Sequence, residues 1–424
     1  MQDWAWYLLV PLWIAWGTQG VLAPILVGRF YSRLRHPRRA GFDAYRPRAA
    51  VIVPFKGAEP ALADNVRALL TQDYPDYRVL LVVESADDPA YGVLRDAAAA
   101  HPGRAEVLCV GQAGPHEGQK VHNLVAAIDH LERRAGDEAV WVFADSDAVP
   151  GPSWLGDLVG PLVQEQTGVS TGYRWLIPEP LPGEKRPRFW AHAASILNAS
   201  ATSFAGKEKF NHAWGGSMAL RTQTARELGL RGWLEGSLSD DYQVTRMIRG
   251  AGLRVYFVVR CLVASPVAFD ARGFAEFVRR QYLITRIHAP AMFRGGLLLL
   301  LHYQLGLWSA LGVMLYTAWT HPAWWAAPGF LLPLLALLVV AGSDQVRATI
   351  RWMLVRRAFG AQIAQEMRST HLIDRFLSPF WMTLNFVLLL SAAVGRTITW
   401  RGITYRMHAP QKIERFATSP NTAR

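Results

Sequence analysis

The stretch AVWVFADSD, residues 139–147, decides the fold of this chain, because an apolar run of strand length ends there in two aspartates. Similar apolar runs stand at residues 49–55 (AAVIVPF), 78–84 (RVLLVVE) and 105–110 (AEVLCV). Runs that are apolar at nearly every position are typical of strands buried on both faces of a largely parallel sheet. We therefore expect these segments to form strands of one sheet.

Helical patterns separate the apolar runs, as in residues 60–72 (PALADNVRALLTQ) and 118–134 (GQKVHNLVAAIDHLERR). Alternation of strand and helix indicates an α/β domain with a Rossmann-like, mostly parallel sheet, which we place at residues 46–288. Its cysteines, Cys109 and Cys261, are too few for a disulfide framework or a metal site and are expected to be buried free thiols. In such sheets ligands bind beyond the carboxyl ends of the strands, so the residues that close each strand matter most.

Acidic residues close two of the predicted strands. Glu84 opens the stretch ESADDP, and Asp145 and Asp147 flank a serine. Two carboxylates near one point suit hard divalent cations, such as Mg²⁺ or Mn²⁺, that bridge to phosphates. Turn formation is the alternative, because Asp and Ser initiate turns. The apolar run before them favours the metal site, so Asp145 and Asp147 are its predicted ligands.

A second acidic pair, Asp240 and Asp241, opens a helical run. Acidic side chains at a helix start are favourable because of the helix dipole alone. A carboxylate beside a substrate hydroxyl can also act as a general base, so both residues are candidates for that role. Upstream, Gly215 and Gly216 either let the backbone approach a substrate closely or simply turn the chain.

The composition indicates a soluble domain joined to a few membrane helices. The 424 residues are 51% hydrophobic and 18% charged, with a net charge of +12. Residues 4–27 are almost uncharged and exceed the roughly 20 residues that cross a bilayer, so residues 1–30 are predicted to be an uncleaved anchor. The basic stretch at residues 29–40 is expected to face the cytoplasm, together with the α/β domain. Basic residues beside apolar segments favour anionic membrane lipids, and not nucleic acid, as a partner.

The last third of the chain predicts further membrane segments. Residues 289–345 contain two apolar stretches joined by a short THPAW link, which predicts a transmembrane hairpin. Residues 346–378 alternate arginines with apolar residues, which predicts an amphipathic helix on anionic headgroups or, alternatively, a simple linker. Residues 379–396 are short for a full crossing and form either a fourth span or a re-entrant segment. The tail, residues 397–424, is basic, and its side of the membrane stays open.

The motifs and their order resemble glycosyltransferase family 2, in particular its ceramide glucosyltransferase-like branch. The resemblance covers residues 49–288 and the membrane segments on both sides. It implies a GT-A fold and an inverting, metal-dependent hexosyltransferase that moves a sugar, glucose first among the candidates, from a UDP-sugar to a lipid hydroxyl such as that of ceramide. The similar segments are VIVPFKG (51–57), VESADDPAY (83–91), GQKVHNL (118–124), FADSD (143–147), GGSMALR (215–221) and LSDDYQ (238–243).

The resemblance also implies a role for single residues. Asp145 and Asp147 would hold the metal on the donor diphosphate, and Asp241, with Asp240 as its neighbour, would be the general base. The residues implied to bind the donor are Pro54, Glu84, Asp87, Lys120, Asp145, Arg280 and Arg286.

One motif departs from the family. The (Gln/Arg)-x-x-Arg-Trp motif aligns with Arg280 at its first position, and Leu283 and Ile284 then replace the Arg-Trp pair. Since that pair supports the leaving diphosphate and the acceptor, the departure puts acceptor placement in question. Arg286, two positions on, is the candidate to restore a cation.

Two other functions stay open. A processive polysaccharide synthase of the same superfamily is one, although such enzymes carry the Arg-Trp pair and more membrane spans. The other is a catalytically inactive, membrane-bound binding or scaffold protein, against which the retained carboxylates argue. The expected location is a bacterial inner membrane, crossed several times, with the catalytic domain in the cytoplasm.

Overall fold

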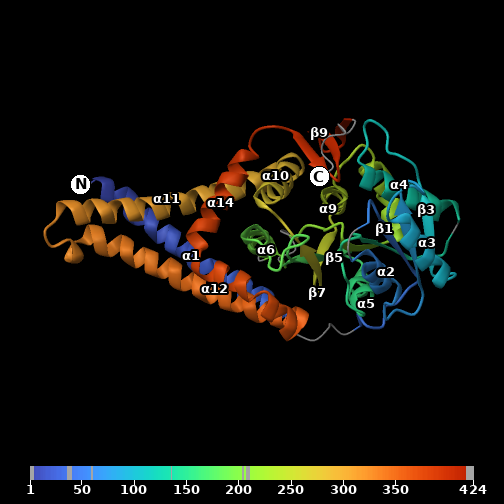
Figure 1. Cartoon of the computed structure of the whole chain (residues 1–424), viewed down its shortest axis with the longest axis horizontal. Helices are drawn as coiled ribbons and strands as arrows, with labels where there is room; N and C mark the ends of the chain where they lie inside the picture. The colour runs from blue at the N-terminus through green and yellow to red at the C-terminus, as the bar shows by residue number, and fades with distance from the viewer. Residues whose placement is uncertain are drawn as a thin grey trace.

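The computed structural model has an α/β domain at one end and an arm of long helices at the other (Figure 1). The start of the first helix and the link between the second and third long helices both lie at the far end of the arm. The structure describes residues 4–35, 41–58, 61–134, 136–202, 205–206 and 211–416, so residues 36–40 of the predicted basic flank and 417–424 of the tail lie outside it.

A seven-stranded sheet with the order β3-β2-β1-β4-β6-β5-β7 forms the centre of the domain. Pairs β1–β2, β2–β3, β1–β4 and β5–β7 are parallel, and β6 runs antiparallel to both of its neighbours. The predicted mostly parallel α/β sheet is therefore confirmed. The strands are β1 (Ala49–Pro54), β2 (Tyr77–Val83), β3 (Ala105–Cys109), β4 (Val140–Ala144), β5 (Thr167–Pro178), β6 (Ser217–Arg221) and β7 (Arg254–Val267).

Helices cover both faces of the sheet, which explains why its strands are apolar at successive positions. Val51 and Val53 of β1 face a cluster with α2, α3 and α5, and Ala50 and Ile52 face a second cluster with α4, α8 and α9. These helices are α2 (Leu62–Leu70), α3 (Tyr91–Ala100), α4 (Gln119–Arg133), α5 (Trp154–Val159), α8 (Leu230–Leu234) and α9 (Asp240–Gly250).

The two cysteines differ in environment. Both are free, but Cys261 is buried and Cys109 is exposed, so the prediction of two buried thiols was wrong for Cys109. The reason is the strand order, because β3 is an edge strand and is only partly covered.

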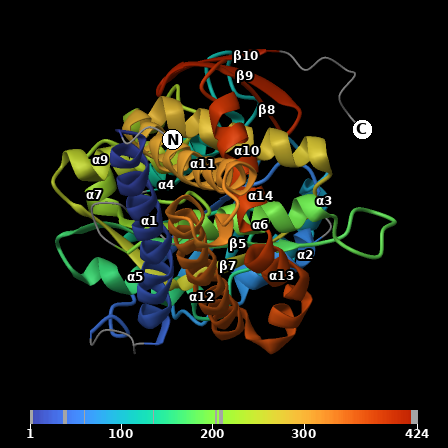
Figure 2. The ribbon, with the colours of Figure 1, turned by 90° about the vertical axis from the view of Figure 1, so that its left-hand side faces the viewer.

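Among the residues that the structure describes, three helices are long and apolar enough to cross a membrane: α1 (Trp4–Arg35), α11 (Pro290–Thr320) and α12 (Pro328–Glu366). They pack together as a bundle seen end-on in Figure 2. Large apolar side chains on their outer surfaces, such as Leu298, Trp319 and Leu338, are exposed. Such a surface fits a lipid environment and not water. The helices continue beyond the predicted apolar stretches towards the α/β domain, where α12 packs on β7.

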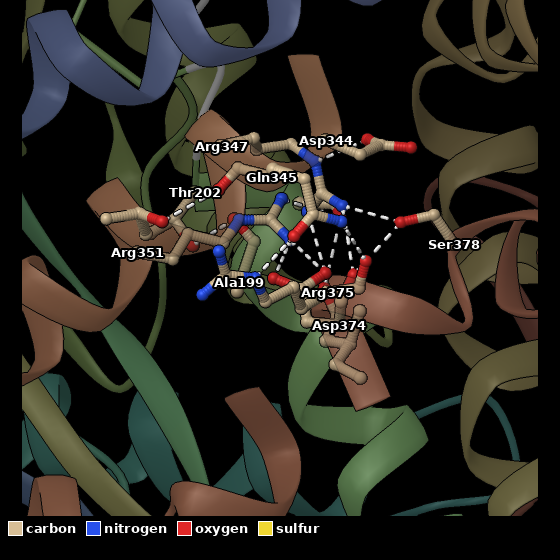
Figure 3. A network of polar contacts seen from close by, with 12 residues as sticks. Ala199, Thr202, Asp344, Gln345, Arg347, Arg351, Asp374, Arg375 and Ser378 are labelled. Atoms are coloured by element: carbon tan, nitrogen blue, oxygen red, sulfur yellow. Dashed lines mark hydrogen bonds and ion pairs between the residues drawn. The ribbon is translucent and has the colours of Figure 1, made fainter. Parts of the chain in front are cut away.

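The region 346–378, predicted to lie on headgroups, is mostly the continuation of α12 followed by α13 (Arg368–Phe376). Two of its arginines, Arg347 and Arg351, are buried (Figure 3). Their Nη1 atoms lie 2.7 Å and 3.1 Å from Oδ1 of Asp374, which is also buried. Arg347 pairs with Asp344 as well, at 3.0 Å, and Arg351 donates to Ser200 of α6 (Phe189–Thr202). These charges therefore join α12 and α13 to the α/β domain and do not face lipid headgroups.

Replacing Asp374 by alanine is expected to lower the stability of the purified protein by about 3 kcal/mol, because it leaves Arg351 buried without its carboxylate. Thermal unfolding in detergent would show this as a lower midpoint. Glu366→Ala, on the exposed end of α12, is the matched control and should change stability by less than about 0.5 kcal/mol. Equal midpoints for the two variants would contradict the structural role of Asp374.

The chain after α13 returns to the α/β domain. Helix α14 (Ser378–Ser391) bends from α13 by 86° and leads into a three-stranded antiparallel sheet, β8 (Thr397–Trp400), β9 (Ile403–Ala409) and β10 (Lys412–Phe416). This sheet contacts the domain, since Arg415 N donates to Pro115 O at 2.7 Å and Gln411 Nε2 to Gly232 O at 2.8 Å. The basic tail therefore lies on the side of the domain. A 14-residue helix spans about 21 Å, less than the roughly 30 Å hydrocarbon core, so α13 and α14 together fit either a broken span or a re-entrant loop.

Candidate active site

The carboxyl ends of β1, β2 and β4 lie side by side at one edge of the sheet, because these strands are parallel and adjacent. Pro54 is buried at the end of β1, and two residues later Lys56 Nζ lies 2.7 Å from Oε2 of Glu84. Asp88 accepts from Gly57 N at 2.9 Å, which ties the β1 and β2 loops together. Asp87 is exposed beside it. The edge thus has a lysine–glutamate pair where donor binding was predicted.

Lys120, in the first turn of α4, joins two of the predicted acidic motifs. Its Nζ atom lies 2.8 Å from Oδ1 of Asp145 and 3.1 Å from Oδ1 of Asp240. Burial by itself lowers the pKa of Lys120, but the two carboxylates outweigh it and hold this pKa above its usual value. The lysine is therefore charged, and it brings together Asp145 and Asp240, which are 95 positions apart in the sequence.

The two glycines of the GGSMALR segment face these carboxylates. A Cβ atom on Gly215 would lie 2.0 Å from Oδ2 of Asp240, and one on Gly216 would lie 2.5 Å from Oδ2 of Asp145. Either contact is shorter than a real Cβ allows. The pair also turns the chain between Trp214 and Ser217, whose backbone N donates to Trp214 O at 3.0 Å, so the turn is present and a close approach to a substrate stays a prediction.

Asp241 lies beside this cluster at the start of α9. Ser239 caps the helix, and Asp241 Oδ1 accepts hydrogen bonds from Ser239 Oγ and, at 2.8 Å, from Tyr242 N. Burial, followed by the nearby charge of Asp240, raises the pKa of Asp241 to about 6. A carboxylate with a pKa raised towards neutrality is suited to accept a proton.

The predicted cations fall into two groups. Arg280 of α10 (Ala271–His288) lies on the side of Asp147: burial and other arginines lower its pKa to about 10, while the charge of Asp147 opposes this shift. Arg286, one helical turn and a half further on, donates to the backbone carbonyls of Ala393 and Gly395. The structure therefore brings Arg280 towards the acidic motif and directs Arg286 to the end of α14.

Several side chains near this edge were not found by reasoning from the sequence. Lys56 pairs with Glu84, and the Tyr405 hydroxyl of β9 accepts from Gln119 N at 3.3 Å. A signal for the C-terminal sheet exists, because apolar residues alternate in ITYRMHA after an Arg-Gly turn, as in a hairpin. The basic charge of the tail masked this pattern.

The residues that could hold a divalent metal ion are few. Within the described ranges, no group of three or more His, Cys, Asp or Glu side chains is arranged for metal binding. Asp145 and Asp147 supply the carboxylates, and a Mg²⁺-type ion commonly uses one or two carboxylates with phosphate and water oxygens. This donor set fits an ion that is held largely by a bound diphosphate.

Two solved structures are among those to which the chain is similar. The chain is similar to a mannosyltransferase from Pyrobaculum calidifontis solved with GDP-Man and Mn²⁺, at 20% identity over 91% of this chain and 97% of that chain, with a TM-score of 0.47. It is also similar to GalNAc-T7 solved with UDP, GalNAc and Mn²⁺, at 15% identity over 55% of this chain and 48% of that chain, with a TM-score of 0.36.

The family assignment comes from the sequence. The family model described as glycosyl transferase family 21 matches residues 20–413, which include the second half of α1, the α/β domain, α11, α12 and most of the C-terminal sheet. The expected glycosyltransferase is confirmed, and the family number that the resemblance indicated, family 2, fits only in part, because the matching model is that of family 21. The chain belongs to glycosyltransferase family 21.

Proposed function

We propose that this protein is an inverting glycosyltransferase of the GT-A type that transfers a sugar, glucose first among the candidates, from a UDP-sugar to a lipid hydroxyl such as that of ceramide. The observation that carries the proposal is the position of Lys120, which binds Asp145 and Asp240 at the carboxyl edge of the sheet beside Asp241. Three motifs that are separate in the sequence thereby form one polar site. A transferase needs such a shared site, because the sugar donor and the acceptor must bind next to each other, here at the carboxyl edge of the sheet.

The donor half of the site is suited to a nucleoside diphosphate. The Lys56–Glu84 pair at the end of β1 and β2 offers both a donor and an acceptor for a nucleoside. Asp145 and Asp147 would hold the metal ion, which when bound supplies positive charge to the leaving diphosphate. Lys120 and Arg280 supply charge of the same sign from the chain itself, and such preorganised charge lowers the barrier by several kcal/mol.

The acceptor half centres on Asp241. As the acceptor oxygen forms its bond to the anomeric carbon, the bond from that carbon to the phosphate oxygen breaks on the opposite face, and the diphosphate takes the bonding pair. Asp241 accepts the hydroxyl proton. Ser239 and Tyr242 N hold the carboxylate in place, and Tyr242 is itself fixed through its hydroxyl, 2.8 Å from Oγ1 of Thr285 on α10.

The long apolar helices support a lipid as the acceptor, because they would hold the site next to the bilayer. Helix α10 joins β7 of the sheet to α11 of the helical arm, so a single helix separates the sheet from the arm along the chain. Helix α1 ends in Arg33 and Arg35 on the side of the α/β domain. By the positive-inside rule the domain then faces the cytoplasm, where the basic residues contact anionic lipids of a bacterial inner membrane.

The direct test is transfer by the purified protein in lipid nanodiscs. The protein is incubated with Mn²⁺, one of several UDP- or GDP-sugars, and either ceramide or diacylglycerol. The masses of the lipid products are then determined by mass spectrometry. We expect a mass increase of one hexose on a hydroxylated lipid with a UDP-sugar. A repeating polymer as product would indicate a processive synthase. Absence of both nucleotide binding and product from folded protein would overturn the proposal in favour of a scaffold.

Metal binding is expected to depend on the nucleotide, because Asp145 and Asp147 supply too few ligands alone and Asp145 is paired with Lys120. Calorimetric titration of Mn²⁺ should give at least about tenfold tighter binding with saturating UDP than without it. Asp147→Asn should abolish this enhancement, whereas Asp96→Asn, an exposed aspartate of α3, should leave the enhancement intact. Equally tight Mn²⁺ binding in the absence of nucleotide would contradict the shared site.

A further inference from the structure

Three arginines from separate parts of the chain, Arg174, Arg280 and Arg401, lie close enough for their charges to interact, and the charge of Asp147 also acts on Arg280. Arg174 of β5 and Arg280 of α10 place their Cζ atoms 5.3 Å and 5.5 Å from the centroid of the same ring, Phe277. The charges of Arg174 and Arg401, the latter from the β8–β9 turn, act with burial to lower the pKa of Arg280, while Asp147 and Glu276 oppose them. Cations gathered in this way repel one another, which favours binding of an anion between them.

One of these arginines has an unmet hydrogen bond. Within the described part of the chain, Nε of Arg174 is buried and has no hydrogen-bond partner. A buried guanidinium donor without a partner is unfavourable unless a ligand satisfies it. This observation is independent of the clustering and points in the same direction.

The turn that carries Arg401 is also unusual. Arg401 has φ of 51° and Gly402 has φ of 75°, so both central residues of this two-residue hairpin are in the left-handed region. Such turns favour Asn or Gly at the first position, and Arg401 is the one non-glycine residue with positive φ in the part of the chain that the structure describes. An arginine kept in a costly conformation indicates a use for its side chain.

The turn packs directly on Arg280. Arg280 Nη1 donates to Thr399 O at 3.4 Å, and its Cζ lies 5.8 Å from the centroid of Trp400. On α10 itself, Leu283 is fully buried against residues of the C-terminal sheet, so this position is part of the core. The Arg-Trp pair that is absent from α10 thus has a counterpart, Trp400 and Arg401, on a different element next to Arg280.

We propose that the β8–β9 turn completes the donor site, with Arg401 and Arg174 binding, together with Arg280, the diphosphate of the nucleotide donor. This inference rests on the proposed function and adds two residues and one element to it. Phosphate is the shared chemistry of a nucleoside diphosphate and an anionic lipid headgroup. The electrostatic interaction between Arg280 and Asp147 favours the nucleotide, because the same phosphates would then meet the carboxylates proposed to bind the metal.

The test compares diphosphate with monophosphate binding to the full-length protein in nanodiscs of neutral lipid with Mn²⁺ present. Calorimetry measures Kd for UDP and UMP, or for GDP and GMP if these are the nucleotides that bind. Arg401→Asn suits the left-handed turn and so retains the fold. We expect it, and Arg174→Gln, to weaken diphosphate binding about tenfold or more and monophosphate binding less than about twofold. Arg406→Asn, an exposed arginine of β9, is the matched control and should leave both unchanged.

The outcomes separate this inference from the function on which it rests. If Arg401→Asn and Arg174→Gln bind both nucleotides as the wild type does, the inference is overturned while the glycosyltransferase function stands. If these variants instead lose only cosedimentation with vesicles of phosphatidylglycerol, the arginines bind lipid and the inference is again overturned. If the folded wild type binds no nucleotide, the proposed function fails first.

Discussion

Asp241→Asn is expected to lower kcat by about 10²–10⁴, because it removes the carboxylate that accepts the proton of the attacking hydroxyl. Asparagine has nearly the same shape, and its Oδ1 can still accept from Ser239 Oγ and Tyr242 N, so the start of α9 should remain folded. Donor binding should be nearly unchanged, since the loss is confined to the acceptor half. Initial rates of lipid product formation and calorimetric Kd values for UDP measure the two effects separately.

The pH dependence of the reaction checks the same assignment. Burial and the charge of Asp240 raise the pKa of Asp241 to about 6, and the base acts only when ionised. The wild-type kcat/KM should therefore be constant above this pH and fall about tenfold per unit below it. The residual activity of Asp241→Asn should lack this descending limb at low pH. A variant with full activity, or one with an unchanged pH profile, would show that another group is the base.

Lys120→Met is expected to have the second large effect, on donor binding and on stability together. The change keeps the length of the side chain but removes the charge that pairs with Asp145 and Asp240. The Asp240 side chain is only 4% exposed, so an unpaired carboxylate there costs about 3–5 kcal/mol. Loss of the cation beside the donor should also lower kcat/KM by about 10²–10³. Thermal unfolding and steady-state kinetics measure the two parts.

A double variant separates these two roles of Lys120. In Lys120→Met with Asp240→Asn, no unpaired charge remains at position 240, so most of the stability should return. Activity should not return, because the cation is still absent. If Asp240→Asn restored activity as well, Lys120 would have only a structural role, and its place in the donor site would be refuted.

The C-terminal sheet shows how local signals compete in this sequence. Net positive charge next to an apolar segment left the tail's side of the membrane open, although the alternation of apolar residues in ITYRMHA is typical of a strand. Both are properties of the same residues, and only packing against the α/β domain decides between them. Hydrogen bonds from Arg415 to Pro115 and from Gln411 to Gly232 fix the sheet beside α4 and α8. The described part of the tail thereby packs on the α/β domain as a folded sheet.

The sequence by itself determined the features that depend on neighbouring residues. Unbroken apolar runs such as residues 139–144 identify strands buried on both faces, and the residues after them, including Glu84 and Asp145, must lie at the ligand edge of a parallel sheet. Length and apolarity were likewise enough to locate the long membrane helices. These properties repeat every few residues, so they can be followed along the chain without knowledge of its packing.

Only the tertiary structure decided which distant side chains pair. The contacts of Lys120 with Asp240, of Arg351 with Asp374, and of Arg280 with Trp400 join segments that the chain order leaves far apart. A charged residue in a sequence has many partners of suitable chemistry. Burial selects among them, because a charge removed from water must meet its counter-charge at the one place where the packed elements leave room for both.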